Sequence, residues 1–198
     1  MAVSAQEVKE LRDRTGAGLM DCKRALQEAA GDMQKAVMSL RQKGLAKARE
    51  KGSRQTAEGV IVSYIHSNGR IGVLLELACE TDFVARNEEF RSLANELAMQ
   101  VAAMDPMVVS RQDVPEQALQ GERKLYLQQC TDKPEQIREK IVAGKLDKFY
   151  EQVCLLEQPY IRDDGRKVAD IISDAIAKLG ENMEVRRFVR MELGRTEA

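Results

Sequence analysis

Residues 60–79 read VIVSYIHSNGRIGVLLELAC. Two runs rich in β-branched and other apolar side chains flank residues 67–70, and an Asn-Gly pair between two such runs is the strongest short-range signal for a β-hairpin. A two-stranded hairpin alone is only marginally stable in water, so a further strand has to join it. The segment therefore predicts an antiparallel sheet of three strands.

The third strand is predicted near the end of the chain, between Met183 and Leu193. Side chains alternate there between two faces, as expected of a strand with one wet face. One face would carry Val185, Arg187, Val189, Met191 and Leu193, and the other Glu184, Arg186, Arg190 and Glu192.

Residues 4–50 predict three short helices. Ser4 and Glu7 have the spacing of a capping box, residues 15–18 (TGAG) interrupt the first helix, and Asp32 is placed to cap the third. A three-helix bundle of this size is marginal alone and often serves as a docking module.

More helices are expected after the hairpin. Asn87 is placed to cap a helix that ends before Pro106, and Pro115 and Pro134 stand at the first turns of two others. Apolar residues between 168 and 179 share one helical face.

The predicted fold class is α+β: a three-helix module followed by a core in which helices cover the three-stranded antiparallel sheet. We expect the module with its linker to span residues 1–52 and the core residues 53–198. The polar, basic stretch at 46–54 (AKAREKGSR) is best interpreted as a solvated helix end, with a phosphate-contacting strip as the alternative.

Composition excludes several function classes. The net charge of the 198 residues is −1, so no global field draws the chain to nucleic acid or an anionic membrane. Nothing approaches the ~18 apolar residues of a membrane span, and the first 14 residues do not resemble a signal peptide. We expect a cytoplasmic protein that binds neither membranes nor nucleic acid directly.

Enzyme motifs are not found in the sequence. The four cysteines, at positions 22, 79, 130 and 154, form no CxxC pair, and buried free thiols are the favoured interpretation. His66 is the one histidine and has no nucleophile signature nearby. We expect no catalytic residue and no cofactor.

An acidic cluster is the one candidate for a metal site. Its members are Glu76, Glu80, Asp82, Glu88 and Glu89. Carboxylates can bind divalent cations. However, Glu88 and Glu89 would point in different directions on a helix, so we expect no bound metal.

Phe83 is unusual because it lies in the connection between a strand and a helix, beside Asp82. The other three phenylalanines fall within predicted elements. From the pattern alone, a hydrophobic staple against the next helix is slightly favoured over an exposed recognition anchor.

The segment around Phe83 resembles a known family. Residues 81–87 (TDFVARN) and 14–26 (RTGAGLMDCKRAL) are similar to the two signatures of the bacterial elongation factor Ts family, and 180–182 (GEN) with Arg187-Phe188 also fit. The matches occur in order over nearly the whole chain.

The resemblance implies a nucleotide exchange factor for the GTPase elongation factor Tu, able to bind it with GDP or without nucleotide. It implies a ubiquitin-associated-like N-terminal module. It further implies that the segment Thr81, Asp82, Phe83 and Val84 acts on the partner's G domain, with Asp82 and Phe83 dislodging its Mg²⁺ ion. By matching positions, Arg12, Leu19 and Met20 would dock the N-terminal module.

The chain departs from the family pattern in two respects. The family often has Met where this chain has Leu19, a volume-conserving change. Longer members carry two core copies and an inserted coiled coil, whereas one core is predicted here. The resemblance to the shorter type implies a homodimer, in which a second chain supplies the second core.

Three function classes compete: an exchange factor, a general protein-binding adaptor built on a ubiquitin-associated-like module, and a small metal-dependent enzyme. The adaptor does not explain why residues 81–84 follow the hairpin. The enzyme lacks a base and a second set of ligands. The exchange factor is therefore the favoured function.

Overall fold

The computed structural model describes residues 3–131 and 133–195. Its contacts divide the chain into two compact units, each built from segments that are distant in the sequence. The first unit contains the residues up to 59 together with 78–90 and 170–184. The second contains 60–77, 91–169 and the residues from 185 onward.

The first unit begins with the three predicted helices. They are α1 (Ala5–Thr15), α2 (Leu19–Glu28) and α3 (Met33–Lys51). Both predicted caps are confirmed: the Glu7 amide donates to Ser4 Oγ over 3.2 Å, and the Lys35 amide donates to Asp32 Oδ1 over 3.0 Å. Side chains of all three helices form one small core that includes Leu11, Leu26 and Leu40.

Helix α8 (Val168–Leu179) packs closely against α3 within this unit. A Cβ added at Gly44 would lie 3.4 Å from that of Ala177, so the absence of a side chain lets the helices approach. Arg41 and Asp170 add an ion pair of 2.6 Å between the same helices.

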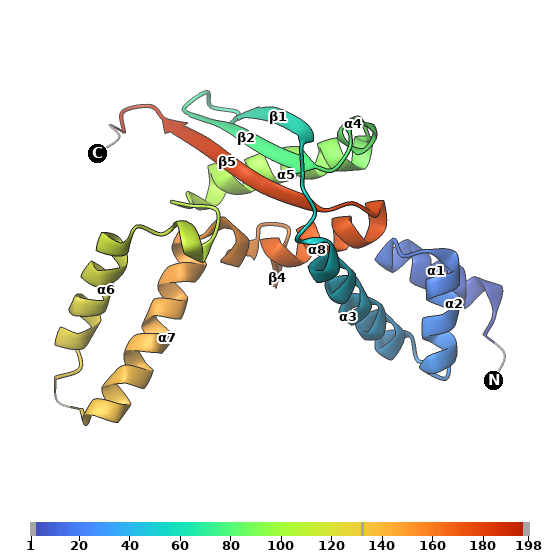
Figure 1. The fold of residues 1–198 in the computed structure, drawn as a ribbon, viewed down its shortest axis with the longest axis horizontal. Helices are drawn as coiled ribbons and strands as arrows, with labels where there is room; N and C mark the ends of the chain where they lie inside the picture. The colour runs from blue at the N-terminus through green and yellow to red at the C-terminus, as the bar shows by residue number, and fades with distance from the viewer. Residues whose placement is uncertain (1–2, 132, 196–198) are drawn as a thin grey trace. The chain divides into compact units, whose positions relative to one another are not determined.

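The predicted hairpin and third strand are confirmed. The sheet contains β1 (Glu58–Ile65), β2 (Ile71–Cys79) and β5 (Met183–Glu192), in the order β1-β2-β5. The hairpin closes where the His66 amide donates to the carbonyl of Ile71 over 2.9 Å. Gly69 occupies its turn with φ of +66°, which a residue without Cβ adopts at little cost. Helix α5 (Glu88–Met104) covers one face of the sheet (Figure 1), so the α+β class is confirmed.

The expected side-chain alternation of β5 is wrong over its second half. Val185 is buried as predicted, but Val189 and Met191 are 50% and 69% exposed. Arg190, expected on the wet face, has a side chain only 10% exposed. The alternation changes phase between Val185 and Phe188, and a strict period of two cannot reveal such a change.

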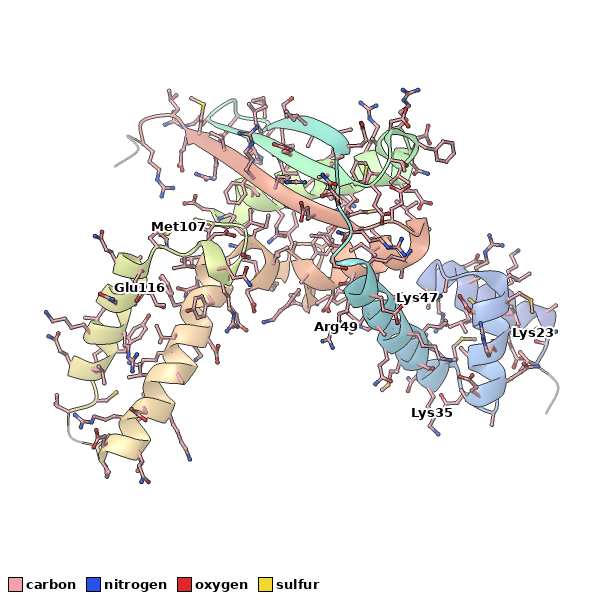
Figure 2. The ribbon with its side chains drawn as sticks, viewed as in Figure 1. Lys23, Lys35, Lys47, Arg49, Met107 and Glu116 are labelled. Atoms are coloured by element: carbon pink, nitrogen blue, oxygen red, sulfur yellow. The ribbon has the colours of Figure 1, made fainter. Side chains whose placement is uncertain are left out.

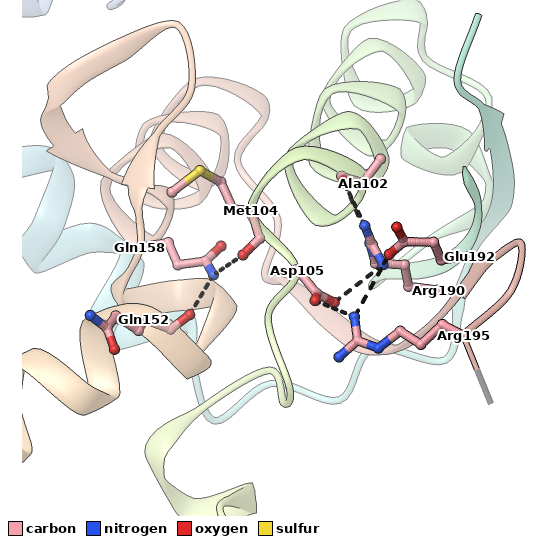
Figure 3. Close-up of polar contacts among 8 residues, drawn as sticks. All are labelled: Ala102, Met104, Asp105, Gln152, Gln158, Arg190, Glu192 and Arg195. Carbon is pink, nitrogen blue, oxygen red and sulfur yellow. Dashed lines mark hydrogen bonds and ion pairs between the residues drawn. The ribbon is translucent and has the colours of Figure 1, made fainter. Parts of the chain in front are cut away.

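Buried polar groups complete the C-terminal end of α5 (Figure 3). The last carbonyls of a helix have no partner within the helix and need donors from elsewhere. Arg190 donates to the carbonyl of Ala102 from both Nε and Nη2, each over 3.3 Å. Gln158 Nε2 donates to the carbonyl of Met104 over 3.2 Å and to that of Gln152 over 2.8 Å. The fully buried Gln158 also accepts from Gln100 over 3.2 Å.

Helices α6 (Glu116–Gln128) and α7 (Glu135–Val153) lie side by side as a helical hairpin (Figure 1). Each begins directly after its predicted proline. The short strands β3 (Pro159–Tyr160) and β4 (Asp163–Lys167) were not predicted. In the described part of the chain, the helices are too short or too polar to cross a membrane.

Candidate functional site

The segment after β2 forms a single helical turn, α4 (Asp82–Ala85). Thr81 caps it: its hydroxyl oxygen accepts from the Val84 amide over 3.4 Å, and its carbonyl accepts from the Ala85 amide over 3.2 Å. Val84 and Ala85 are buried, at 6% and 7% exposure. The turn is thus anchored by these two buried side chains and capped at its first residue.

Phe83 projects from this anchored turn and is 80% exposed. The hydrophobic staple favoured by the sequence pattern is therefore wrong, and the ring is exposed, as the alternative interpretation required. The core positions beneath the turn are taken by Val84 and Ala85, so burial of the phenyl ring is not needed to hold the backbone. Large exposed aromatic side chains are typical of interaction sites.

Asp82 lies beside Phe83 and is also accessible. Its carboxylate pairs with Arg86 over 3.0 Å, and both side chains are well exposed. An exposed pair of this kind contributes little to stability and is easily exchanged for another partner. Asp82 and Phe83 therefore form one accessible patch with an acidic and an apolar part.

The loop between α8 and β5 holds the turn from the side. The carboxylate of Glu181 accepts from the Thr81 amide over 3.0 Å and from the Thr81 hydroxyl over 2.6 Å. Conversely, a carboxylate next to the turn binds the loop: that of Glu80 accepts from the Asn182 amide over 2.6 Å. We call these three hydrogen bonds the carboxylate clamp.

Two further members of the acidic cluster are engaged in separate ion pairs. Glu76 pairs with Arg187 over 2.7 Å, and Glu89 pairs with Lys178 over 2.8 Å. Among residues 3–131 and 133–195, no group of three possible metal ligands occurs. These two carboxylates thus pair with different cations.

The second predicted set of site residues lies on the N-terminal helices. Arg12 is exposed on α1. Leu19 and Met20, in the first turn of α2, are 53% and 68% exposed. This set and residues 81–84 belong to the same compact unit.

The basic stretch at 46–54 forms the end of α3 and the residues that follow it (Figure 2). Lys47 pairs with Asp21 over 3.2 Å, and Lys51 donates to the carbonyl of Gly180. Arg54 lies 3.5 Å from Glu80. Because these cations have partners within the chain, the solvated helix end is favoured over a phosphate-contacting strip.

The residues considered for nucleophilic chemistry have ordinary structural roles. All four cysteines are free and buried, as predicted. Burial, with a smaller effect from the charge of Glu181, raises the pKa of Cys79 to about 11. His66 is exposed, and its Nδ1 lies 3.2 Å from the Tyr64 hydroxyl.

Comparison with known proteins covers almost the whole chain. The family model "Elongation factor TS" matches residues 9–194. The chain belongs to the elongation factor Ts family. It is 59% identical over 194 residues to elongation factor Ts of Thermotoga petrophila, with 98% of each chain covered. It is 54% identical over 198 residues to that of Thermodesulfovibrio yellowstonii, covering 100% of this chain and 99% of the relative.

Elongation factor Ts is a nucleotide exchange factor for elongation factor Tu in translation elongation, and not a catalytic enzyme. Membership decides for the exchange factor against the adaptor and the metal-dependent enzyme. It also accounts for an exposed, anchored turn without catalytic groups, because an exchange factor acts by binding.

Sequence reasoning missed what holds this turn. In the sequence Glu181 stands out only as part of a family motif, and its bond to Thr81 joins residues 100 positions apart. The sequence nevertheless contains a signal for this contact. One short motif, 80–84, directly follows a predicted strand, and another, 180–182, directly precedes a strand that could pair with it. Their side chains meet at the end of the β2–β5 ladder.

Proposed function

We propose that residues 81–84 are the element of this exchange factor that acts on the nucleotide site of elongation factor Tu. Asp82 and Phe83 enter its G domain and displace the Mg²⁺ ion, which promotes GDP release and lets GTP bind. The exposure of Phe83 on an anchored turn is the observation that carries the proposal. The factor works in the cytoplasm with its partner.

Displacement of the ion is an effective way to release a nucleotide. Mg²⁺ bridges phosphate oxygens to the protein, so its removal uncovers the charge repulsion that it had compensated. Coupling between two ligands is reciprocal. A factor that weakens GDP binding is therefore itself bound less tightly in the presence of GDP, and it binds the empty GTPase best.

The phenyl ring cannot supply all of the coupling energy. Burying one such side chain contributes roughly 1.5–3 kcal/mol, which corresponds to about 10- to 150-fold in affinity. A tightly held nucleotide requires a larger shift. The remainder comes from a wider interface, and residues 81–84 direct that binding energy to the ion.

Phe83→Ala tests this role. In stopped-flow measurements of fluorescent GDP release from elongation factor Tu, the stimulation by this variant should be at least about tenfold weaker than that by the wild type. Leu125→Ala is the matched control, because it also truncates an exposed apolar side chain, 47% exposed on α6. Wild-type stimulation by the Phe83→Ala variant would rule out the proposed insertion of the ring.

The N-terminal module, residues 1–52, supplies part of the wider interface through Arg12, Leu19 and Met20. The exposure of the two apolar side chains on α2 supports this docking role. Met20→Asp should weaken association with elongation factor Tu in calorimetry without altering the circular dichroism spectrum. An unchanged dissociation constant would count against docking.

A homodimer is proposed through the core, residues 53–198, at the face of the sheet not covered by α5. The exposed apolar side chains of the three strands and the residue after them support this interface: Ile61, Ile65, Leu74, Val189, Met191 and Leu193. Contiguous apolar surface is a typical feature of homodimer interfaces.

Leu74→Glu tests the dimer, because Leu74 lies in the central strand and is 53% exposed. Light scattering should give twice the chain mass for the wild type and the single-chain mass for the variant. A single-chain mass for the wild type, alone and with elongation factor Tu, would contradict the dimer.

A further inference from the structure

Phe83 has little side-chain packing to fix its position. Its ring is 80% exposed, so its direction is set by the backbone of the turn that carries it. That backbone is held by the buried Val84 and Ala85 and, at its first residue, by Thr81. Whatever fixes Thr81 therefore also fixes the direction of the ring.

Thr81 is fixed by the carboxylate clamp. Both donors of Thr81, its amide and its hydroxyl, bind the two oxygens of the single carboxylate of Glu181. The same hydroxyl oxygen accepts from the Val84 amide over 3.4 Å. A chain of hydrogen bonds thus runs from Glu181 through the hydroxyl into the single turn of α4.

The loop that provides Glu181 is itself tied to the last residue of α3 and to the segment that follows this helix. Asn182 Nδ2 donates to the carbonyl of Arg54 over 2.9 Å, and Lys51 donates to the carbonyl of Gly180. The amide of Asn182 is bound by Glu80. The loop that carries Glu181 is thus held by hydrogen bonds to both of its neighbours, Gly180 and Asn182.

We propose that Glu181 is a positioning residue for nucleotide exchange: its carboxylate holds Thr81 so that Phe83 is directed for insertion. The inference rests on the proposed role of Phe83. Glu181 does not touch the partner's nucleotide in this scheme. It raises the fraction of molecules in which the ring is in the active orientation, and so it acts on the rate of release after docking.

Glu181→Gln removes the charge and replaces one acceptor oxygen by an amino group that faces a donor of Thr81. Release of fluorescent GDP is measured as a function of factor concentration, which separates the maximal rate from the half-saturating concentration. The maximal rate should fall about tenfold, the range of a hydrogen bond to a charged group. The half-saturating concentration should change by less than about twofold, because the docking contacts remain.

Glu184→Gln is the matched control. Glu184 is two residues from Asn182, and its carboxylate accepts from the Thr56 hydroxyl over 2.8 Å. It should leave the maximal rate unchanged. Thr81→Val tests the same bond from the donor side, should Glu181→Gln not fold, and should reduce the maximal rate in the same way.

The double variant Phe83→Ala/Glu181→Gln separates positioning from general destabilisation. If Glu181 acts through the ring, the double variant is no slower than Phe83→Ala alone. A Glu181→Gln variant that raises only the half-saturating concentration, with Phe83→Ala still slow, would overturn the positioning role and leave the proposed insertion of Phe83 intact. A Phe83→Ala variant with the wild-type rate would overturn both.

Discussion

The turn at residues 81–85 and the C-terminal end of α5 use polar groups in opposite ways. At the end of α5, Arg190 and Gln158 are directed inward, and each binds carbonyls that a helix end leaves without partners. At the turn, hydrogen bonds that Thr81 donates to Glu181 hold a backbone whose largest side chain, Phe83, is exposed. The first arrangement stabilises the fold, whereas the second keeps an apolar side chain accessible.

Among the inward-directed polar groups, loss of Gln158 should reduce the free energy of unfolding most. Gln158→Leu leaves the carbonyls of Met104 and Gln152, and one donor of Gln100, without this partner. Unfolding in urea should show a loss of about 3–5 kcal/mol, since each buried group left unpaired costs about 1–3 kcal/mol.

Gln152→Ala is the control for that experiment, because the exposed Gln152 contributes only its backbone carbonyl to the network. Its unfolding free energy should change by less than about 0.5 kcal/mol. Similar losses in the two variants would show that the network does not stabilise this end of α5.

Loss of Arg190 should have the next largest effect. Arg190→Met keeps most of the side-chain length but leaves the Ala102 carbonyl without its donor and removes a cation from a helix C-terminus. The expected loss is about 2 kcal/mol. Arg190 also pairs with Asp105 over 3.4 Å. Arg195→Met, which removes an exposed partner of that carboxylate, should cost less than about 1 kcal/mol. Equal losses in chemical denaturation would contradict the capping role of Arg190.

Elements set by local patterns could be predicted from the sequence, whereas contacts between distant residues could not. The hairpin, the caps at Ser4 and Asp32 and the third strand follow from local patterns, and all are confirmed. The burial of Arg190 does not follow from a local pattern, because the α5 carbonyl that it binds is 88 residues away.

The candidate site shows the same limit. Residues 81–84 could be singled out by their position after a strand and by family resemblance. The exposure of Phe83 depended on whether Val84 and Ala85 filled the core beneath it, and the support from Glu181 depended on strand pairing across 100 residues. Side-chain direction at the end of a ladder is a tertiary property, and periodicity does not report it.

Acid should affect a third set of polar contacts by a smaller amount. Arg111 hydrogen-bonds Glu157 and, together with Lys167, lowers the pKa of that carboxyl group below its usual 4.5. The stabilising contribution is therefore complete above about pH 4.5 and is lost as the pH falls through the lowered folded-state value. Because the partners are exposed, it should be on the order of 1 kcal/mol or less.

Glu157→Gln should accordingly reduce the loss of Tm between pH 5 and pH 3, as measured by circular dichroism. Glu139→Gln, at an exposed carboxylate on α7, is the control and should follow the wild-type curve. The interpretation fails if the Glu157 variant loses as much Tm as the wild type.

Phe83→Ala should have the smallest effect on stability, within about 0.5 kcal/mol, because the side chain is largely solvated in the folded chain. Phe90→Ala is the matched comparison: the same residue type, seven positions later, is fully buried and should cost about 3–5 kcal/mol. Urea unfolding of both variants, with GDP release measured on the same preparations, makes the contrast direct. A large stability loss in Phe83→Ala would mean that the ring supports the turn, and the turn would then no longer be a pre-formed support for an exposed side chain.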